Sequence, residues 1–257
     1  MKIVIIGTGN VASVLGNLLK SAGHPIIQVF GRSEAAVEEL AGQLNAQPCS
    51  SWSEINKGAD LYLVAIADKA LIDLHRQLIL SDQLIVHTAG AVSQKILQPI
   101  SFNYGVLYPL QTLKKGMTVA TQIPLLVDAS NEQTKGELLK VAADISGSVM
   151  TASDEQRLKY HVAAVFVNNF TNHMYTLAES YCLQEGISFN MLLPLAAETT
   201  QRLQATSPAQ VATGPAIRRD QATIQKHLEL LGHHAPLQGL YAALTKSIQQ
   251  WHQQENG

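Results

Sequence analysis

The sequence has 257 residues, of which 46% are hydrophobic and 15% charged, and its formal net charge at pH 7 is −2. A chain of this kind can form one large or two moderate globular domains, each with its own core. The sequence has no clusters of basic residues, which binding to nucleic acids or anionic membranes would require. No apolar run is long enough for a signal peptide or a membrane span, so we expect a cytoplasmic protein.

Short apolar runs alternate with helical patterns in the first part of the chain. The predicted strands are residues 3–6, 25–30, 47–49, 60–66, 84–87, 106–108, 123–127 and 148–150. This alternation predicts a doubly wound, mostly parallel sheet of the Rossmann type. From Asp154 only helical periodicity remains, unbroken to about Glu185 and then interrupted by glycines and prolines. We therefore expect an α/β fold with a Rossmann-type domain over residues 1–152, followed by an all-α domain over residues 153–257.

The first predicted strand runs directly into a glycine turn. Its residues are Gly7, Thr8, Gly9, Asn10, Val11 and Ala12. In a dinucleotide site the first glycine permits the tight turn, the second lets the backbone approach the pyrophosphate, and the third small residue lets the helix pack on the strand. The helix that opens there would point its free N–H groups at the phosphates. Because the motif stands between a strand and a helix, it predicts a dinucleotide-binding turn.

The end of the second predicted strand indicates which dinucleotide binds. NAD sites usually have an acidic residue there, which binds the ribose hydroxyls, whereas this sequence has Gly31, Arg32 and Ser33. Arg32 could pair with a 2′-phosphate and Ser33 could add a hydroxyl, which favours NADP as the cofactor. The alternative is that Arg32 is a solvated loop residue and Ser33 only caps the next helix.

Two further segments follow predicted strands and should line the same cleft, because ligands of open α/β sheets bind beyond the carboxyl ends of the strands. We expect Ala67, Asp68 and Thr88 to contact the cofactor and Gly90 to contact the substrate. Asp68 could instead cap the helix that follows it. His87 would either donate a hydrogen bond to a substrate carbonyl or satisfy a backbone carbonyl at the strand end.

Several blocks of the sequence resemble one known family. They are residues 87–91, 105–112, 158–165, 168–169, 192–195 and 213–220. The family consists of Rossmann-like proteins with a helical domain of unassigned function, described as NADP- or deazaflavin-dependent oxidoreductases. More distantly, the architecture is similar to pyrroline-5-carboxylate reductase and to the β-hydroxyacid dehydrogenases, including 6-phosphogluconate dehydrogenase. The resemblance implies hydride transfer to or from a small-molecule substrate and a homodimer formed through the helical domain. Where the family commonly has His, Ser and Gly, this chain has Tyr108, Ala89 and Arg219.

The resemblance also implies that proton-transfer residues come from the long helix after the sheet. In the β-hydroxyacid relatives this helix offers a lysine and an asparagine, and Lys159, Asn168 and Asn169 lie on the corresponding helix here. His161 and Asn168 are seven residues apart and so share nearly one helical face. Since histidine ordinarily titrates near neutral pH, we expect His161 to transfer the proton while Asn168 or Asn169 holds the substrate oxygen. Alternatively, these side chains form a polar seam between packed helices.

The turn at residues 214–220 enters another helix. Arg218 could clamp a substrate carboxylate while Asp220 holds the guanidinium, and the resemblance implies that this turn completes a site in a neighbouring subunit. The alternative is a capping Asp220 and a solvated Arg218. The two cysteines belong to no recognisable motif, and His233-His234 has no carboxylate or cysteine at metal-ligand spacing, so no metal site is expected.

The sequence as a whole favours an NADP-dependent oxidoreductase. Its substrate would be a small carbonyl, imine or hydroxyl compound, or a deazaflavin, bound in the cleft between the domains. The alternative is an NADP-binding redox sensor or scaffold without turnover, because two polar positions of the family are replaced at Ala89 and Tyr108.

Overall fold

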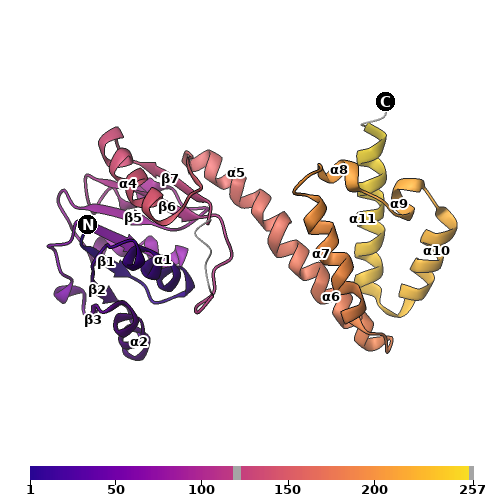
Figure 1. The fold of residues 1–257 in the computed structure, drawn as a ribbon, viewed down its shortest axis with the longest axis horizontal. Helices are drawn as coiled ribbons and strands as arrows, with labels where there is room; N and C mark the ends of the chain where they lie inside the picture. Colours follow the sequence, from indigo (N-terminus) through magenta and orange to yellow (C-terminus); the bar gives the residue numbers. More distant parts are fainter. Residues whose placement is uncertain (118–122, 255–257) are drawn as a thin grey trace. The chain divides into compact units, whose positions relative to one another are not determined.

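The computed structural model describes residues 1–117 and 123–254. The chain divides into two compact units, Met1–Asn169 and Phe170–Gly257. The first contains the sheet and the second is helical, which confirms the expected fold class (Figure 1). The first unit also takes in helix α5 (Asp154–Ala164), so it extends past residue 152, where the sequence pattern changes. None of the helices in the described ranges is long and apolar enough to cross a membrane.

One eight-stranded sheet forms the centre of the first unit, in the order β3-β2-β1-β4-β5-β6-β7-β8. The strands are β1 (Ile3–Ile6), β2 (Ile26–Phe30), β3 (Gln47–Cys49), β4 (Leu61–Val64), β5 (Leu84–His87), β6 (Tyr104–Pro109), β7 (Leu125–Ala129) and β8 (Val149–Thr151). Among the strands in the described ranges, only β6 and β7 pair antiparallel. Because the chain crosses from β1 to β2 on one side and later to β4 on the other, the strand order reverses at β1, which is where ligands of such sheets bind.

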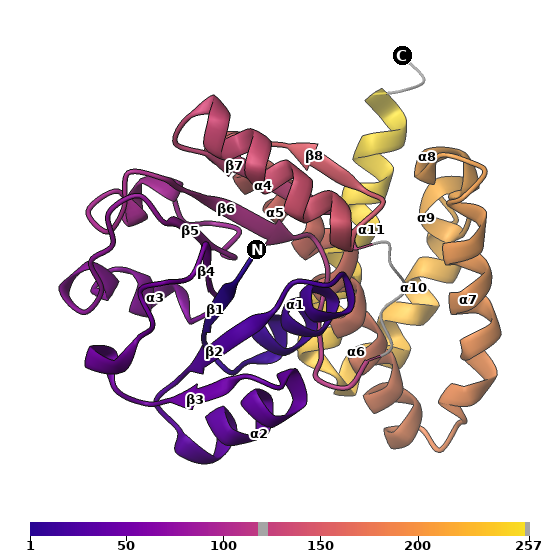
Figure 2. The same cartoon turned by 60° about the vertical axis from the view of Figure 1, so that its left-hand side comes forward.

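Both faces of the sheet are covered, as the wholly apolar strands predict. Ile3 and Ile5 of β1 belong to one hydrophobic cluster, and Val4 and Ile6 belong to another. The first cluster includes side chains of α1 (Asn10–Ser21), α2 (Glu34–Leu44) and α4 (Glu132–Ile145), and the second includes side chains of α3 (Asp68–Leu71) and the short 3₁₀ turns η2 (Leu74–Arg76) and η3 (Gln94–Leu97). Figure 2 shows α1, α2 and α4 together with the strands that they cover.

Two glycines allow close packing around β1. Gly7 has a φ of +124°, and a Cβ there would lie 2.1 Å from the carbonyl oxygen of Ala65, so only glycine fits. A Cβ at Gly16 would lie 2.8 Å from side-chain carbons of Ile5 and Leu44. Gly16 therefore allows the close approach of α1 that we expected from Ala12, which is itself fully buried in the same cluster.

The helical part begins where a capping box predicts it. Ser153 and Gln156 exchange side-chain to backbone hydrogen bonds at the start of α5. A π-helical segment (Val165–Phe170) and α6 (Thr171–Gln184) follow directly, so the unbroken periodicity to about Glu185 is confirmed. The remaining elements are η5 (Phe189–Leu192), α7 (Leu193–Arg202), α8 (Pro208–Val211), α9 (Pro215–Arg218), α10 (Gln221–Leu230), η6 (Leu231–His233) and α11 (Ala235–Gln254).

Candidate cofactor and substrate site

The glycine turn forms one wall of a cavity of about 370 Å³ at the carboxyl ends of β1 and β2, which we call the glycine-turn cavity. Its lining includes six of the residues expected to bind the cofactor: Gly7, Thr8, Gly9, Gly31, Arg32 and Ala67. Gly9 is the N-cap of α1, and a Cβ there would meet nothing within 4 Å. The backbone at Gly9 is therefore open to a ligand, and no side chain caps the first N–H groups of α1, as a phosphate site requires.

The residues that follow strand β2 also fit the role in binding NADP that the sequence predicts for them. A Cβ at Gly31 would lie 2.8 Å from side-chain carbons of Thr8 and Val37, so an acidic residue could not stand there without a shift of its neighbours. Arg32 is exposed and makes no ion pair or hydrogen bond with the described residues. Ser33 is the N-cap residue of α2, as the alternative had it, but its side chain makes no capping hydrogen bond.

Two side chains of this cavity were not expected from the sequence. Trp52 packs on Phe30 with ring centroids 4.0 Å apart, and both rings line the cavity. Asp73 adds a carboxylate to the lining, and it pairs with the exposed Arg76 at 3.2 Å. The glycine-turn cavity therefore offers an aromatic wall and groups of both charges.

A second cavity of about 280 Å³, the strand-end cavity, adjoins the first and shares Gly9, Ala65 and Ile66 with it. Its other lining residues are Asn10, Val11, Asp68, Thr88, Ala89, Gly90, Ala91 and His161. The N-cap of the short helix α3 is Ala67, with no capping side chain, so the alternative that Asp68 caps this helix is wrong. Ala12 and Ser33 are the expected cofactor residues that do not line either cavity among the residues described.

A third cavity of about 540 Å³, the helix cavity, lies along α5 and the π-helical segment and shares His161 with the strand-end cavity. It is lined by Tyr108, Leu110, Gln111, Thr112, Tyr160, His161, Ala163, Ala164, Val165, Val167, Asn168 and Asn169. The expectation that His161, Asn168 and Asn169 face one space is confirmed. Asn168 lies in the π-helical segment, where its Nδ2 donates a hydrogen bond to the hydroxyl of Thr112.

Tyr108 and His161 form a hydrogen-bonded pair where these two cavities meet. The Tyr108 hydroxyl lies 2.9 Å from Nδ1 of His161, and the rings are edge to face. A Cβ at Gly90 would lie 2.8 Å from His161 Nδ1 and 2.9 Å from Tyr108 Cζ, so glycine is what allows the loop to pass. Burial raises the pKa of the Tyr108 hydroxyl, while the nearby Arg157 cation opposes this rise. The pair can therefore hold a proton beside a ligand up to alkaline pH.

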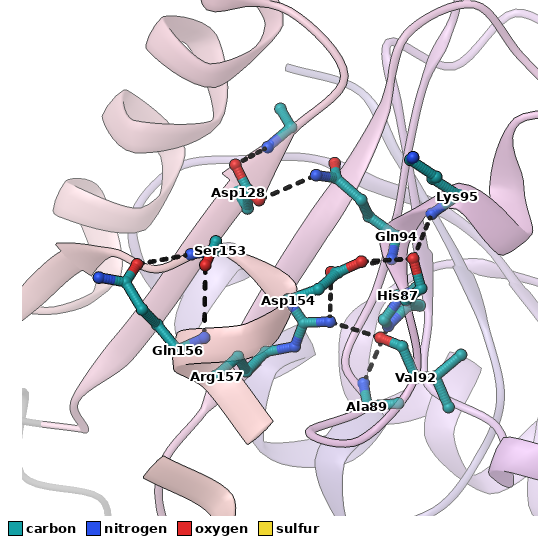
Figure 3. Close-up of polar contacts among 12 residues, drawn as sticks. His87, Ala89, Val92, Gln94, Lys95, Asp128, Ser153, Asp154, Gln156 and Arg157 are labelled. Carbon is teal, nitrogen blue, oxygen red and sulfur yellow. Dashed lines mark hydrogen bonds and ion pairs between the residues drawn. The ribbon is translucent and has the colours of Figure 1, made fainter. Parts of the chain in front are cut away.

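A polar network under this pair ties α5 to the loop that follows β5 (Figure 3). Arg157 is 1% exposed; its Nη2 donates to the carbonyl of Val92 and lies 2.7 Å from Asp154. Asp154 accepts hydrogen bonds from the Ser93 hydroxyl and, at 3.1 Å, from the Gln94 N–H. Burial opposes ionisation of Asp154, but these donors hold its pKa below the usual range. The network fixes the loop that carries Gly90.

The chain matches the Rossmann-like domain family over residues 1–111 and a domain of unknown function, DUF2520, over residues 123–248. A solved structure from Bacteroides fragilis, provisionally named an NADP oxidoreductase, is 37% identical with a TM-score of 0.90 and covers 97% of this chain and 98% of that chain. The chain belongs to this Rossmann-like DUF2520 family. Among proteins with curated descriptions, none matches this sequence.

Two more distant structures share the fold of this DUF2520 protein. A 1-pyrroline-5-carboxylate reductase from Streptococcus pyogenes is 17% identical with a TM-score of 0.66, covering 97% of this chain and 98% of that chain. An imine reductase from Myxococcus stipitatus in complex with NADP⁺ is 17% identical with a TM-score of 0.65, covering 97% of this chain and 93% of that chain. At this identity they support the architecture alone.

His87 lies beneath the site of the DUF2520 protein and not in it. It is fully buried and is absent from the described residues that line the three cavities. Its Nδ1 accepts a hydrogen bond from the backbone N–H of Ala89 at 3.1 Å, so of our two alternatives the contact with backbone at the strand end is the one found, with a donor in place of a carbonyl. Burial and then the Arg157 charge lower its pKa from 6.5 to about 4, so His87 is neutral near pH 7. The expectation that it donates to a substrate carbonyl is wrong.

Three other expected residues are not brought to these cavities. Lys159 is exposed and pairs with Glu155 at 2.5 Å, and it is not among the described residues that line the three cavities. Asp220 caps α10, where it accepts hydrogen bonds from the N–H and hydroxyl of Thr223 at 3.0 and 2.7 Å; these bonds hold its pKa below the usual range. Arg218 is exposed and forms no ion pair with Asp220. The alternative of a capping Asp220 is thus confirmed.

Proposed function

We propose that this protein is an NADP-dependent oxidoreductase that transfers a hydride between NADP(H) and a small carbonyl, imine or hydroxyl substrate. The observation that carries the proposal is the hydrogen-bonded pair of Tyr108 and His161 in the wall between the strand-end and helix cavities. A cofactor that follows the sheet edge from the glycine turn would end beside this pair. The names of the Bacteroides fragilis and Myxococcus stipitatus proteins support the same class.

The residues present fit NADP. Gly7 and Gly9 leave room for a pyrophosphate at the start of α1, and the side chain of Arg32 is free to pair with a 2′-phosphate. When bound, the cofactor supplies the hydride, and the protein has to position the substrate and provide the proton. None of the relatives reported above is named for deazaflavin, and we do not propose it as a partner.

The proton would come from Tyr108. During reduction its hydroxyl donates a proton to the substrate oxygen or nitrogen. His161 holds the hydroxyl in place and returns a proton to it through Nδ1, while Nε2 takes up a proton from solvent. Asn168, fixed by Thr112, and Asn169 orient the polar end of the substrate in the helix cavity. The sensor without turnover is not favoured, because Tyr108 replaces the family histidine with another group that can donate a proton.

We also propose that the protein forms a homodimer through its helical unit. Among the described residues of Phe170–Gly257, the buried apolar side chains are only Cys182, Ala216, Ile224 and Leu231. Large apolar side chains are exposed instead, among them Leu183, Met191, Leu195, Leu230 and Trp251. A unit with so small a core does not offset the entropy of its own chain, and such exposed groups mark an interface. Sedimentation equilibrium should give twice the 27.8 kDa chain mass.

Cofactor binding can be tested through Trp52. The protein has two tryptophans, and Trp251→Phe leaves Trp52, in the glycine-turn cavity, as the single reporter. NADPH should quench its fluorescence. In this background Arg32→Ala should weaken NADPH and leave NADH almost unchanged, whereas Arg202→Ala, which removes an exposed arginine of helix α7 in the other unit, should change neither. Equal losses for both nucleotides in Arg32→Ala would refute the 2′-phosphate assignment.

Turnover is tested by NADPH oxidation with a panel of ketones, ketoacids and cyclic imines. His161→Ala should abolish turnover with NADPH affinity retained. Tight NADPH binding without turnover of any member of the panel would favour the sensor instead.

A further inference from the structure

Among the residues that the structure describes, the lining of the helix cavity is partly polar but holds no permanently charged side chain. Its described lining consists of five aliphatic side chains, two tyrosines, one histidine and four side chains with a neutral amide or hydroxyl, and no Asp, Glu, Lys or Arg is among them. A ligand in this cavity therefore meets hydrogen-bond donors and acceptors but no fixed charge. Because ligand sites pair charged groups with opposite charges, this lining restricts the substrates that can bind.

Two cations on helix α5 are engaged elsewhere. Arg157 precedes His161 by one helical turn, but it is 1% exposed and its guanidinium is held by Asp154 and the Val92 carbonyl, so a substrate cannot touch it. Lys159 points to solvent and pairs with Glu155. A substrate carboxylate in the helix cavity would lose its water without gaining a counter-charge, which disfavours binding.

Arg218 does not change this conclusion. It was the residue expected to clamp a carboxylate, with Asp220 holding it, but Asp220 is engaged by Thr223. Among the described residues, Asp220 therefore does not hold the Arg218 guanidinium in position for a carboxylate.

We infer that the substrate is an uncharged carbonyl or imine compound with an apolar body and without a carboxylate. The volume of about 540 Å³ has room for a substituted ring, the aliphatic and tyrosine side chains cover its hydrocarbon part, and the amides hold its polar end. The inference rests on the proposed function and names its substrate class. That class differs from the carboxylate in the name of the Streptococcus pyogenes relative.

A matched pair of ligands isolates the charge. Methyl 3-oxocyclopentane-1-carboxylate and the free acid, 3-oxocyclopentane-1-carboxylate, have the same ring and ketone, and only the acid is charged. Their dissociation constants are measured by saturation-transfer NMR on the full-length protein saturated with NADP⁺. The ester should bind at least about tenfold more tightly than the acid. Equal binding, or tighter binding of the acid, would overturn the inference, as would a lack of binding of both.

A charge inserted in the wall should reverse the preference. Gln111 lines the helix cavity and is exposed, so substitution there carries little risk for folding. Gln111→Lys should strengthen binding of the acid by about tenfold, and Gln111→Met, of similar length but neutral, should not. If the acid already binds more tightly to the wild type and Arg218→Ala removes that advantage, the arginine clamp is correct and our inference is wrong.

The binding assay distinguishes a failure of this inference from a failure of the proposed function. Rapid NADPH oxidation with the acid but not the ester would support the oxidoreductase and overturn the substrate class. Failure of NADPH to quench Trp52 would contradict the proposed function itself, whatever the two ligands do.

Discussion

The buried His87 should make the stability of the first unit depend on pH. Its side chain is fully buried under the site, and burial and the charge of Arg157 lower its pKa from 6.5 to about 4. Between these two values the unfolded chain binds a proton that the folded chain does not. Stability therefore rises with pH in this window, and it is lost as the pH falls from 6.5 to 4.

The size of this effect follows from the two pKa values. Each unit of pKa difference corresponds to about 1.4 kcal/mol, so acidification from pH 6.5 to pH 4 should remove roughly 3 kcal/mol of unfolding free energy through His87 alone. Asp154, whose pKa is held below its usual 3.8, loses its contribution only at lower pH. Asp128, whose pKa burial raises above 3.8, acts in the opposite direction at the acidic end, so the slope nearer pH 6.5 reports His87 most directly.

Urea denaturation at pH values from 4.5 to 7 measures the effect. In the Trp251→Phe background the fluorescence of Trp52 follows the first unit alone. His87→Asn keeps an acceptor for the Ala89 N–H but does not titrate, so its stability should vary less with pH than that of the parent. His75→Asn, which replaces a half-buried histidine of the same unit, should retain the parent's slope.

Two results would refute the reasoning about His87. One is the same pH slope in the parent and in His87→Asn. The other is a wild-type His87 imidazole that titrates near 6.5 in ¹³C-edited NMR spectra, a measurement that does not require the variant to fold.

Three further predictions concern the site and the helical unit. Tyr108→Phe should lower kcat/KM by about 10²–10³ with NADPH affinity retained. Because burial raises the pKa of Tyr108 above its ordinary 10, the rate of reduction by the wild type should decline only above that pH. An unchanged rate or pH profile in the variant would contradict the role of Tyr108 as proton donor. Gly90→Ala should crowd His161 and Tyr108 and lower the unfolding free energy of the first unit by about 1–3 kcal/mol, measured in urea. A variant as stable as the wild type would show that the two side chains can move aside at little cost. Arg219→Gly, at a φ of +54°, should stabilise the helical unit by about 0.5–1 kcal/mol, followed through Trp251, unless the Arg219 side chain makes compensating contacts.

The fold could be predicted from the sequence because its signals are local. A run such as Ile3–Ile6 is apolar at each position, which requires cover on both faces, and its alternate residues do enter separate clusters. The antiparallel pairing of β6 and β7 could not be predicted, since strand direction depends on a connection and not on the strand's own pattern. The π-helical turn at Val165–Phe170 was also missed, because it leaves the apolar periodicity almost unchanged.

Residues of the candidate site could be predicted only where their position at the end of a strand is enough to place them. Gly7, Gly9 and Arg32 follow strands β1 and β2, so the rule of carboxyl ends places them correctly. His87 ends a strand too, but its side chain points into the core, and the same rule gives no direction for a side chain. Tyr108 was treated as the loss of a family histidine, and its position near the end of β6 could have marked it as a candidate, although only the structure shows that its side chain faces the helix cavity.

The replacement at Tyr108 is better understood together with its neighbours than alone. Its hydroxyl bonds to His161, and the two side chains leave no space for a Cβ at position 90. The loop that carries Gly90 is held in turn by Asp154 and Arg157 from the first turn of α5. Since helix α5 also carries His161, one rigid helix positions both the Tyr108–His161 pair and the loop that packs against this pair. Under the proposed function, Tyr108 keeps a hydroxyl beside His161 where the family commonly has a histidine, so we expect turnover to be retained.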